Sequence, residues 1–460
     1  MSGLLAYATY LPVHRLDPSD IGIRGSRVVA SFDEDSTTLA VAAATALRSG
    51  LAEPMAAGSL FFATATPAYA DKTNAAAIHA ALRLPADTFA ADLVGSGRSP
   101  VAALRAALAG GGLVVAGDVR VGKPGSVDEK TGGDAGAAVL LGDGPAIAEV
   151  LAVVAATEEL LDRWRLPTSL TAEQWEERFG FERYAALVRA TAGRALAAAG
   201  LEEADHVVLT SPNQGVAKRG GSLVKGLLST GTSPLGFSGA TDPLLALAAV
   251  LDEAGPGETV LLLSAVDGCD AVVLRTTDLL PGRRQARSVA VQLAGGRTVD
   301  YPTYLSWRGL LERELPRRPE PDRPAGPPSA RGVDWKFGFT GSRCTACGFV
   351  HLPPTRVCRA CDVADAMEPA PASGLHGTVT TYTVDRLAYS PSPPVVDVVV
   401  DFDGGGRCSL EVADADSEAL AVGSRVDLSF RRLFTAGGVH NYFWKARLVP
   451  DGDESDRSRA

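Results

Sequence analysis

Residues 134–141, Asp-Ala-Gly-Ala-Ala-Val-Leu-Leu, return in shortened form as residues 270–274, Asp-Ala-Val-Val-Leu. Each copy closes a series in which apolar, strand-like runs alternate with amphipathic, helix-like stretches. The order β-α-β-α-β-α-β-β of the first series recurs about 140 residues later, and a repeat of that size fixes the architecture. We therefore expect an α/β fold of two five-stranded, mostly parallel or mixed sheets that pack through shared central helices. The halves are predicted at about 1–143 and 144–280.

The composition is that of an ordinary globular protein. The chain has 460 residues, 46% hydrophobic and 21% charged, with 44 Lys and Arg against 54 Asp and Glu, hence a net charge of −10. Such an acidic chain is a poor candidate for nucleic-acid binding. No apolar run reaches the length of a membrane span, and the N-terminus lacks the basic region of a signal peptide. We therefore expect a cytoplasmic protein with no membrane or nucleic-acid partner.

The composition changes after residue 280. Residues 281–334 are predicted to be a linker with one short helix, because six prolines fall within the thirteen residues 316–328. Five short alternating strands in 369–449 predict a small OB-type β-barrel. The charged residues 450–460 are expected to be a disordered tail.

Four of the six cysteines predict a metal site. They are spaced as two C-x2-C pairs, Cys344 with Cys347 and Cys358 with Cys361, within residues 335–368. Two such pairs offer four thiolates in the tetrahedral arrangement that Zn²⁺ prefers, and they leave no open position for chemistry. The spacing therefore predicts a zinc ribbon with a structural Zn²⁺. Cys269 and Cys408 are predicted to be buried thiols.

Several stretches carry a resemblance to known families. They are YLPVHRL (10–16), ATATPAYADKTNAAAIHAALRLP (63–85), EKTGGDAGAAVLLGDG (129–144), CTACGFVHLPPTRVC (344–358) and FTAGGVHNYFWKA (434–446). Residues 1–280 resemble the thiolase superfamily, in particular its ketoacyl synthase III and HMG-CoA synthase branch. Residues 335–449 resemble the family that joins a rubredoxin-like zinc ribbon to an OB barrel and accompanies thiolase-type enzymes.

The catalytic positions of that branch are altered here. The resemblance implies a nucleophilic cysteine at the start of the central helix, where this chain has Ser96 or Gly97. The family's His falls in Thr210–Pro212, its Asn at Phe237 or Ser238, and the Glu of HMG-CoA synthases near Ala65. A serine without a neighbouring base has little nucleophilicity, so condensation through an acyl-cysteine is not expected. The helix starts at 95–99 and 215–218 are expected to hold a thioester or enolate oxygen.

Five residues are candidates for a catalytic role: Ser96, Ser211, Asn213, Tyr69 and Asp267. Tyr69 lies with Asp71 and Lys72 in a segment that approaches the cavity in the superfamily, although a solvated loop explains it equally simply. Ser211 and Asn213 replace the family's His segment at a strand end. Asp267, like Asp270, is either a base or a turn former.

Basic residues are the candidates for binding coenzyme A phosphates. Lys218, Arg219 and Lys225 form a cluster whose alternative is a charged helix face. Arg431 and Arg432 of the barrel either meet a phosphate or face solvent. His14, His79 and His206 are interpreted as structural histidines.

The resemblance implies a protein that handles acyl-CoA thioesters, with Zn²⁺ as structural cofactor. We expect Cys-independent carbon–carbon bond chemistry, retro-aldol or aldol, or acyl transfer, in lipid, sterol or polyketide metabolism. The alternative is a non-catalytic acyl-CoA-binding scaffold that partners a separate thiolase or HMG-CoA synthase. Single-strand nucleic-acid binding through Tyr442–Trp444 is a minor third hypothesis. A homodimer is expected from the resemblance.

Overall fold

The computed structural model describes residues 3–22, 27–318 and 331–449. Its internal contacts divide the chain into two units. The first comprises Met1–Ser31, Asp35–His79 and Pro85–Arg308, and the second comprises Phe32–Glu34, Ala80–Leu84 and Gly309–Ala460.

The first unit contains ten strands whose order shows the duplication. The order along the sheet is β5-β4-β6-β7-β1 followed by β8-β14-β13-β11-β12. The strands of the first half are β1 (Gly3–Tyr10), β4 (Ser59–Thr64), β5 (Phe89–Val94), β6 (Gly112–Asp118) and β7 (Ala135–Gly142). Those of the second half are β8 (Ala148–Thr157), β11 (His206–Thr210), β12 (Ser229–Gly231), β13 (Thr259–Ser264) and β14 (Gly268–Thr276).

Strand directions repeat as well. In the first half β4 is parallel to β5 and β6, and β7 is antiparallel to β6 and β1. In the second half β11 is parallel to β12 and β13, and β14 is antiparallel to β13 and β8. Within the described sheet the strands of the two halves pair where Gly3 and Leu4 of β1 meet Glu149 and Ala148 of β8. The prediction of two five-stranded mixed halves is therefore confirmed.

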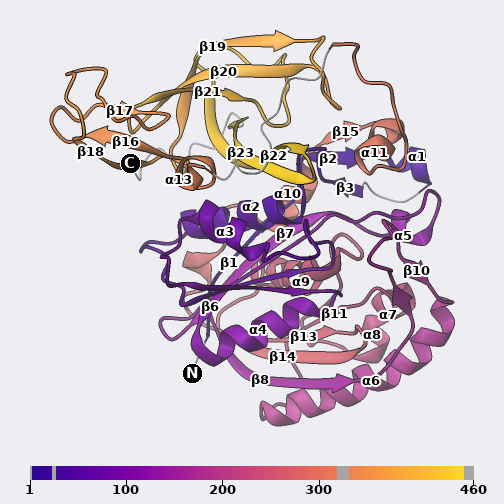
Figure 1. Ribbon diagram of the computed structural model, residues 1–460. Helices are drawn as coiled ribbons and strands as arrows, with labels where there is room; N and C mark the ends of the chain where they lie inside the picture. Colours follow the sequence, from indigo (N-terminus) through magenta and orange to yellow (C-terminus); the bar gives the residue numbers. More distant parts are fainter. Residues whose placement is uncertain (1–2, 23–26, 319–330, 450–460) are drawn as a thin grey trace. The chain divides into compact units, whose positions relative to one another are not determined.

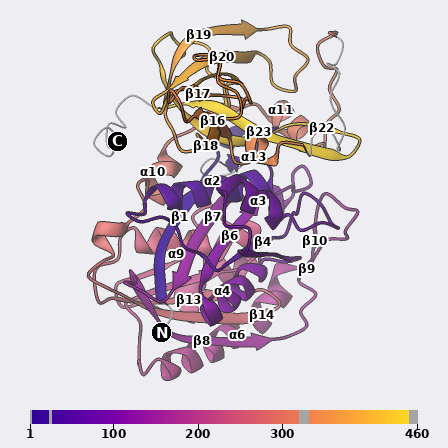
Figure 2. The same cartoon turned by 60° about the vertical axis from the view of Figure 1, so that its left-hand side comes forward.

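Helices cover both halves and separate them, as Figures 1 and 2 show. α2 (Ser36–Ser49) packs on β1, β6 and β7, and α6 (Glu177–Ala198) packs on β8, β13 and β14. Between the sheets lie α4 (Ser99–Gly110), which contacts β4, β6 and β7, and α9 (Asp242–Leu251), which contacts β7 as well as β11 and β13. α4 and α9 also contact each other. The shared central helix layer predicted from the repeat is therefore present.

The region between β11 and β12 differs from the prediction. The sequence GVAKRGGSLVKGLL (215–228) predicts a single helix, but the structure has two short ones, α7 (Gln214–Lys218) and α8 (Gly220–Leu223). Gly226 then lets the backbone pass so close to Ser229 that an added Cβ would stand 2.1 Å from the carbonyl oxygen of Ser229. The sequence SPLGFSG (233–239) predicts a short strand, but the structure has a loop in which Phe237 makes an isolated bridge to Gly132. Glycines at these close approaches stop both regular elements.

The expected linker begins later than the sequence indicates. Residues 281–308 belong to the first unit, where β15 (Arg297–Val299) extends a small sheet with β2 (His14–Leu16) and β3 (Arg27–Val29). The helices α10 (Val289–Ala294) and α11 (Tyr301–Trp307) flank β15. The prediction of a linker over 281–334 is therefore wrong for its first half. Residues 319–330 of the proline-rich stretch, and the tail 450–460, lie outside the described residues.

The first unit has further short elements. They are α1 (Pro18–Ile21), α3 (Ala75–Leu82), α5 (Val127–Lys130), β9 (Arg163–Trp164), β10 (Glu173–Gln174) and the 3-10 turns η1 (Gly239–Thr241) and η2 (Pro281–Arg283).

From residue 331 to 449 the second unit consists of strands and loops together with the short helix α13 (Val333–Lys336). A three-stranded sheet forms its ribbon: β16 (Thr340–Cys344), β17 (Val350–His351) and β18 (Met367–Pro371). Its barrel has the order β21-β20-β19-β22-β23, with β19 (Gly377–Asp385), β20 (Val395–Phe402), β21 (Arg407–Glu411), β22 (Arg425–Ala436) and β23 (Val439–Leu448). A parallel bridge from Val412 to Ala446 closes the ends, so the five-stranded barrel is confirmed. No helix in the described part of the chain is long and apolar enough to cross a membrane.

Candidate functional site

The loop between β5 and α4 holds the position where the resemblance places a nucleophile. Gly97 is buried there, and the ring of Phe237 lies against it. A Cβ added to Gly97 would stand 3.1 Å from Cζ and 3.2 Å from Cε2 of Phe237. The position therefore has no side chain, and an aromatic ring occupies the adjoining space.

Ser96 stabilises its own loop. Its Oγ accepts a hydrogen bond from the backbone N–H of Arg98 at 3.2 Å, and its N–H donates to Ser99 Oγ at 3.4 Å. The side chain is half-buried, and neither of these two hydrogen bonds joins it to a base. Ser96 therefore matches a turn-forming serine and lacks the activation that a nucleophile needs.

Arg98 links the start of α4 to the second half of the duplication. Its Nε donates to Asp270 Oδ2 at 2.7 Å and its Nη2 donates to Asp270 Oδ1 at 3.0 Å. Its Nη1 donates to the carbonyl oxygen of Asp267 at 3.0 Å. The hydrogen bond to Asp270 raises the pKa of the guanidinium. Two predicted residues, Ser96 and Asp267, are thus brought together through an arginine that the sequence reasoning missed.

Asp267 combines strain with burial. Its φ of +47° lies in the left-handed region that non-glycine residues rarely adopt. Burial raises the pKa of its carboxyl group, and Arg98 offsets only part of this shift. Asp267 is therefore the predicted catalytic residue whose carboxyl group has a raised pKa, which makes it a candidate base.

Ser211 and Asn213 hold the chain between β11 and α7. The Oγ of Ser211 donates to the carbonyl of Ala265 at 2.9 Å and accepts from Asn213 N–H at 3.2 Å. Asn213 caps α7 through Val216 N–H and donates to Asp162 Oδ1 at 3.2 Å. Both residues are buried and their polar atoms are engaged in these bonds. The Asn213 cap engages the N–H of Val216 in α7, so this N–H is not free to hold a thioester or enolate oxygen.

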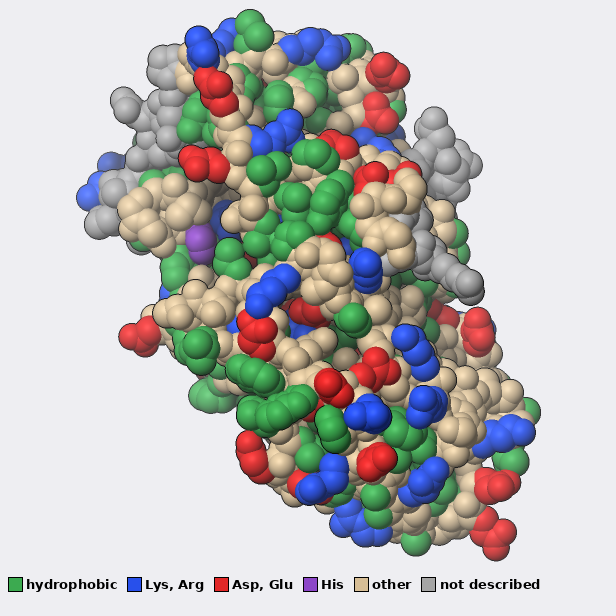
Figure 3. Space-filling model, turned by 90° about the vertical axis from the view of Figure 1, so that its right-hand side faces the viewer, with side chains coloured by type: hydrophobic (Ala, Val, Ile, Leu, Met, Phe, Trp, Pro, Cys, Tyr) green, Lys and Arg blue, Asp and Glu red, His purple; other side chains and the backbone are tan. Residues whose placement is uncertain are grey.

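The remaining sequence candidates lie on the surface or near it. Tyr69 is half-buried, with the Lys72 ammonium 6.0 Å from its ring centre. Lys218, Arg219 and Lys225 are exposed, and the Arg219 guanidinium stacks over Phe181 at 4.6 Å. On the face drawn in Figure 3, the lower part carries Lys and Arg side chains interspersed with Asp, Glu and hydrophobic ones.

A buried cluster of charged side chains lies against the Phe237 ring, and the sequence did not predict it. Asp128 accepts two hydrogen bonds of 2.8 Å from Arg163 and one of 3.2 Å from Arg120. The two guanidinium carbons lie 5.4 Å and 4.9 Å from the Phe237 ring centre. Burial opposes the charge of Asp128, yet the two arginines outweigh it and keep its pKa lowered. Burial, together with the repulsion of Arg120, lowers the pKa of Arg163 to about 10.

Asp118 locks three loops together at the end of β6. It is fully buried, and its Oδ1 accepts from Thr64 Oγ1 at 2.6 Å, Ala65 N at 2.9 Å and Thr66 N at 3.0 Å. Its Oδ2 accepts from Ala240 N–H at 2.5 Å. Asp118 therefore fixes the loop at Ala65 relative to the segment that follows Phe237.

Asp242, the first residue of α9, is a second buried carboxyl group. Its Oδ1 accepts from Ser238 N at 3.2 Å and from Ser238 Oγ at 3.1 Å, whereas Oδ2 is buried without a hydrogen-bond partner. Burial raises its pKa to about 7.

The four predicted zinc ligands converge in the second unit. The ligand atoms of Cys344, Cys347, Cys358 and Cys361 all lie within 4.8 Å of one another. The Cys344–Cys361 and Cys347–Cys358 sulfur pairs are 3.7 and 3.6 Å apart. A tetrahedral ion with Zn–S bonds of about 2.3 Å requires sulfur separations of about 3.8 Å, so the cluster fits Zn²⁺.

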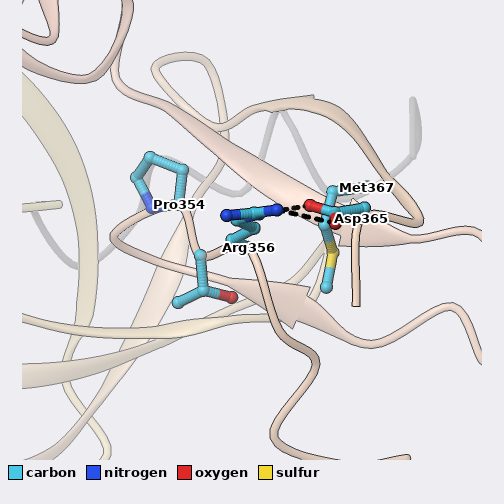
Figure 4. Close-up of a pocket in the computed structure, with 5 residues that line it drawn as sticks. Pro354, Arg356, Asp365 and Met367 are labelled. Atoms are coloured by element: carbon cyan, nitrogen blue, oxygen red, sulfur yellow. Dashed lines mark hydrogen bonds and ion pairs between the residues drawn. The ribbon is translucent and has the colours of Figure 1, made fainter. Parts of the chain in front are cut away.

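A shallow pocket of about 390 Å³ lies on the ribbon, lined by residues 354–356, Asp365 and Met367. Figure 4 shows the Arg356 guanidinium directed at Asp365, and its Nη2 donates to Oδ2 at 2.9 Å. Because both side chains are exposed and neutralise each other, the pocket offers no preference for a charged ligand.

Arg431 of the barrel forms buried ion pairs. Arg431 is fully buried and pairs, within the second unit, with Asp414 at 2.6 Å and with Asp33 at 3.1 Å. Trp444 is buried and donates from its indole nitrogen to the carbonyl of Phe337 at 2.7 Å. The hypotheses of a phosphate contact at Arg431 and of a base-stacking surface that includes Trp444 are therefore wrong.

Comparison with known families supports both parts of the assignment. Residues 338–368 match the rubredoxin-like zinc ribbon domain of ChsH2, and residues 370–431 match the C-terminal OB-fold domain of ChsH2. The solved structures similar to the chain include MvaS at 19% identity and a TM-score of 0.57, covering 66% of this chain and 91% of that one. The first unit has a thiolase-like fold.

Other relatives agree with the thiolase-like assignment. Ketoacyl synthase III (FabH) of Pseudomonas aeruginosa aligns over 98% of its length and 60% of this chain, with a TM-score of 0.53 and 19% identity. The hydroxymethylglutaryl-CoA synthase of Archaeoglobus fulgidus is 28% identical over 347 residues, which cover 68% of this chain and 100% of that protein. The corresponding enzyme of Methanothermobacter thermautotrophicus is 29% identical over 346 residues, 68% of this chain and 99% of its own.

Proposed function

We propose that the thiolase-like unit binds acyl-CoA thioesters and acts on them without forming an acyl-enzyme. The observation that carries the proposal is the contact of Phe237 with Gly97, at the position where the resemblance implies a nucleophile. Similar solved structures were obtained in complex with 3-hydroxy-3-methylglutaryl-CoA and with CoA, which supports CoA thioesters as the ligand class.

The reaction that fits this arrangement is carbon–carbon cleavage of a β-hydroxyacyl-CoA, or its reverse. A base removes the β-hydroxyl proton, the bond between the α and β carbons breaks, and a carbonyl compound leaves. The electron pair passes to the thioester as an enolate, which then takes up a proton. Asp267, with its raised pKa, is the candidate base, and the Arg98 guanidinium at the start of α4 is the candidate for stabilising the enolate.

A specific observation favours the alternative of a non-catalytic acyl-CoA-binding scaffold. Three predicted catalytic side chains, Ser96, Ser211 and Asn213, are engaged in hydrogen bonds that stabilise local structure. A protein of this kind would present the thioester to a separate thiolase or HMG-CoA synthase.

The phosphate-binding residues, the metal, the oligomeric state and the metabolic context are also proposals. Lys218, Arg219 and Lys225 are exposed and provide the positive charge for CoA phosphates. A structural Zn²⁺ on the four cysteines, a cytoplasmic homodimer and a place in lipid, sterol or polyketide metabolism complete the proposed setting.

Product analysis separates the two functions. The purified full-length chain is incubated with a panel of β-hydroxyacyl-CoA and acyl-CoA thioesters, and the products are followed by mass spectrometry. Cleavage to a shorter acyl-CoA and a carbonyl compound, lost in Asp267→Asn and retained in the exposed control Asp87→Asn, supports the enzyme. Binding without turnover, together with turnover once a partner thiolase is added, supports the scaffold. The absence of both binding and turnover would contradict both functions.

A further inference from the structure

Away from the α4 site, three side chains at one end of the second half form a continuous hydrogen-bonded chain. Nδ1 of His206 lies 2.7 Å from Ser229 Oγ, and Nε2 of His206 lies 2.8 Å from Glu258 Oε2. The residues begin β11 and β12 and directly precede β13, so three strand ends bring them together. A hydroxyl, an imidazole and a carboxylate in this order are the parts of an activated serine.

Glu258 fixes the tautomer that such a site requires. Hydrogen bonds from His206 and from the N–H of Gly255 lower the pKa of the Glu258 carboxyl, so this group is an anion at neutral pH. A carboxylate only accepts, so His206 presents N–H to Glu258 and its Nδ1 lone pair to Ser229. The neighbouring Asp205 holds Thr259 through two hydrogen bonds of 2.8 and 2.7 Å, which makes the frame rigid.

The three residues differ in exposure. Ser229 is exposed, His206 is buried to 8% exposure, and the Glu258 side chain is 29% exposed. The serine oxygen is thus open to a substrate, whereas the base is enclosed. Leu227 and Leu228, directly before Ser229, are exposed at 61% and 62% and provide an apolar surface for an acyl group.

The backbone of β12 offers a donor for the oxyanion. In the described sheet β12 is an edge strand that pairs with β11 alone. The N–H of Ser229 donates to the carbonyl of Asp205 on the β11 side. Because successive N–H groups of a strand alternate in direction, the N–H of Thr230 faces the open edge beside the serine.

We propose that Ser229, His206 and Glu258 form a second catalytic site, which hydrolyses esters or thioesters with an apolar acyl group. Ser229 Oγ attacks the carbonyl carbon while its proton passes to His206 Nδ1, and the leaving alcohol or thiol takes up that proton. Water, deprotonated by His206, then attacks the acyl-serine, releases the acid and returns the proton to Ser229. The site is independent of the function proposed for the α4 region.

A fluorophosphonate probe, which reacts with activated serines, tests this site directly. We expect one label per chain on the peptide that contains Ser229, with fluoride as the leaving group. Ser229→Ala should abolish labelling. The control Ser222→Ala changes an exposed serine on α8 whose Oγ donates to the carbonyl of Arg219, and it should leave labelling unchanged. No label on the wild-type chain, or a label that persists in Ser229→Ala, would overturn the proposal.

Hydrolysis of p-nitrophenyl butyrate provides the kinetic measurement. Ser229→Ala is expected to lower kcat/KM by at least about 100-fold, and Glu258→Gln by between about 100- and 10000-fold. Thermal unfolding curves establish that each variant is folded. A merely structural hydrogen-bond chain would change the melting temperature but show no acyl-serine in the intact mass and no loss of hydrolysis in Ser229→Ala.

Discussion

Phe237 packs against Gly97 so closely that a Cβ on Gly97 would lie 3.1 Å from the ring. Such a separation is tighter than ordinary van der Waals contact, so a side chain at position 97 would require the Phe237 ring to shift. The absence of a cysteine where the resemblance implies one therefore goes together with a phenylalanine ring packed against the same position.

Restoring the cysteine alone should therefore not restore covalent chemistry. Gly97→Cys is expected to destabilise the fold by about 1–3 kcal/mol through overpacking and to form no acetyl-enzyme with acetyl-CoA. The double variant Gly97→Cys, Phe237→Ala relieves the clash and should recover part of that stability. Urea unfolding and intact mass after incubation provide the two measurements, and a single variant as stable as wild type would contradict the steric argument.

The Arg98–Asp270 ion pair predicts that removing the arginine costs more folding stability than neutralising the aspartate. Arg98→Met leaves the Asp270 carboxylate, whose side chain is 4% exposed, without its charged partner, and should cost about 2 kcal/mol. Asp270→Asn leaves an arginine that is 22% exposed and can turn to solvent, so its cost should be about half as great. Chemical denaturation measures both, and equal losses would refute the asymmetry.

The buried carboxyl group of Asp242 predicts stability that falls as pH rises. Its folded pKa of about 7 exceeds the unfolded value of 3.8, so between these values the native state binds more protons than the unfolded chain. The free energy of unfolding of wild type, relative to Asp242→Asn, should therefore decline by on the order of 2 kcal/mol from pH 5 to pH 8. The exposed variant Asp87→Asn serves as control, and parallel pH profiles for wild type and Asp242→Asn would contradict the assignment.

Zinc removal should affect the ribbon specifically. We expect one Zn²⁺ per chain by elemental analysis, lost in Cys344→Ser and after chelation at mild acid pH. Proteolysis of the chelated chain should begin within residues 338–368, while the first unit keeps its melting transition. A metal-free protein with an unchanged protease pattern would contradict a structural role for the ion.

The edge strand β5 predicts how two copies of the chain meet. In the described sheet β5 pairs with β4 alone, and Phe89 and Val94 at its ends are exposed at 62% and 51%. An open apolar edge is a surface for pairing with a second chain, so we predict that the proposed homodimer pairs through β5 and dissociates in the double variant Phe89→Lys, Val94→Lys. Light scattering after size exclusion measures the mass, with Val127→Lys on α5 as exposed control. A dimer that persists in the double variant would exclude this edge.

The sequence predicts what depends on local patterns. The alternation of apolar runs predicts the duplicated strand order, and the spacing of Cys344 to Cys361 predicts the zinc cluster, because both signals lie within short windows. Gly226 breaks the helix that the sequence predicts over 215–228, but its close approach to the backbone of Ser229 is visible only in three dimensions.

The charged networks could not be predicted in the same way. Asp128 meets Arg163 across 35 residues, and Arg98 meets Asp270 across 172. The sequence suggests a structural role for His206, because it stands at no catalytic position of the family; its partners Ser229 and Glu258 lie 23 and 52 residues away in the chain. Only the register of β11 beside β12 and β13 reveals such partners.

The duplication also leaves the two inner helices with matching first turns. α4 begins with Ser99 and Pro100, and α9 begins with Asp242 and Pro243. The same kind of helix start thus occurs twice in one chain. α4 starts beside the turn at Gly97, and α9 starts with the buried carboxyl group of Asp242. Exchanging the two dipeptides would show how far the first two residues of each helix determine their own environment, and how far the surrounding half of the duplication does.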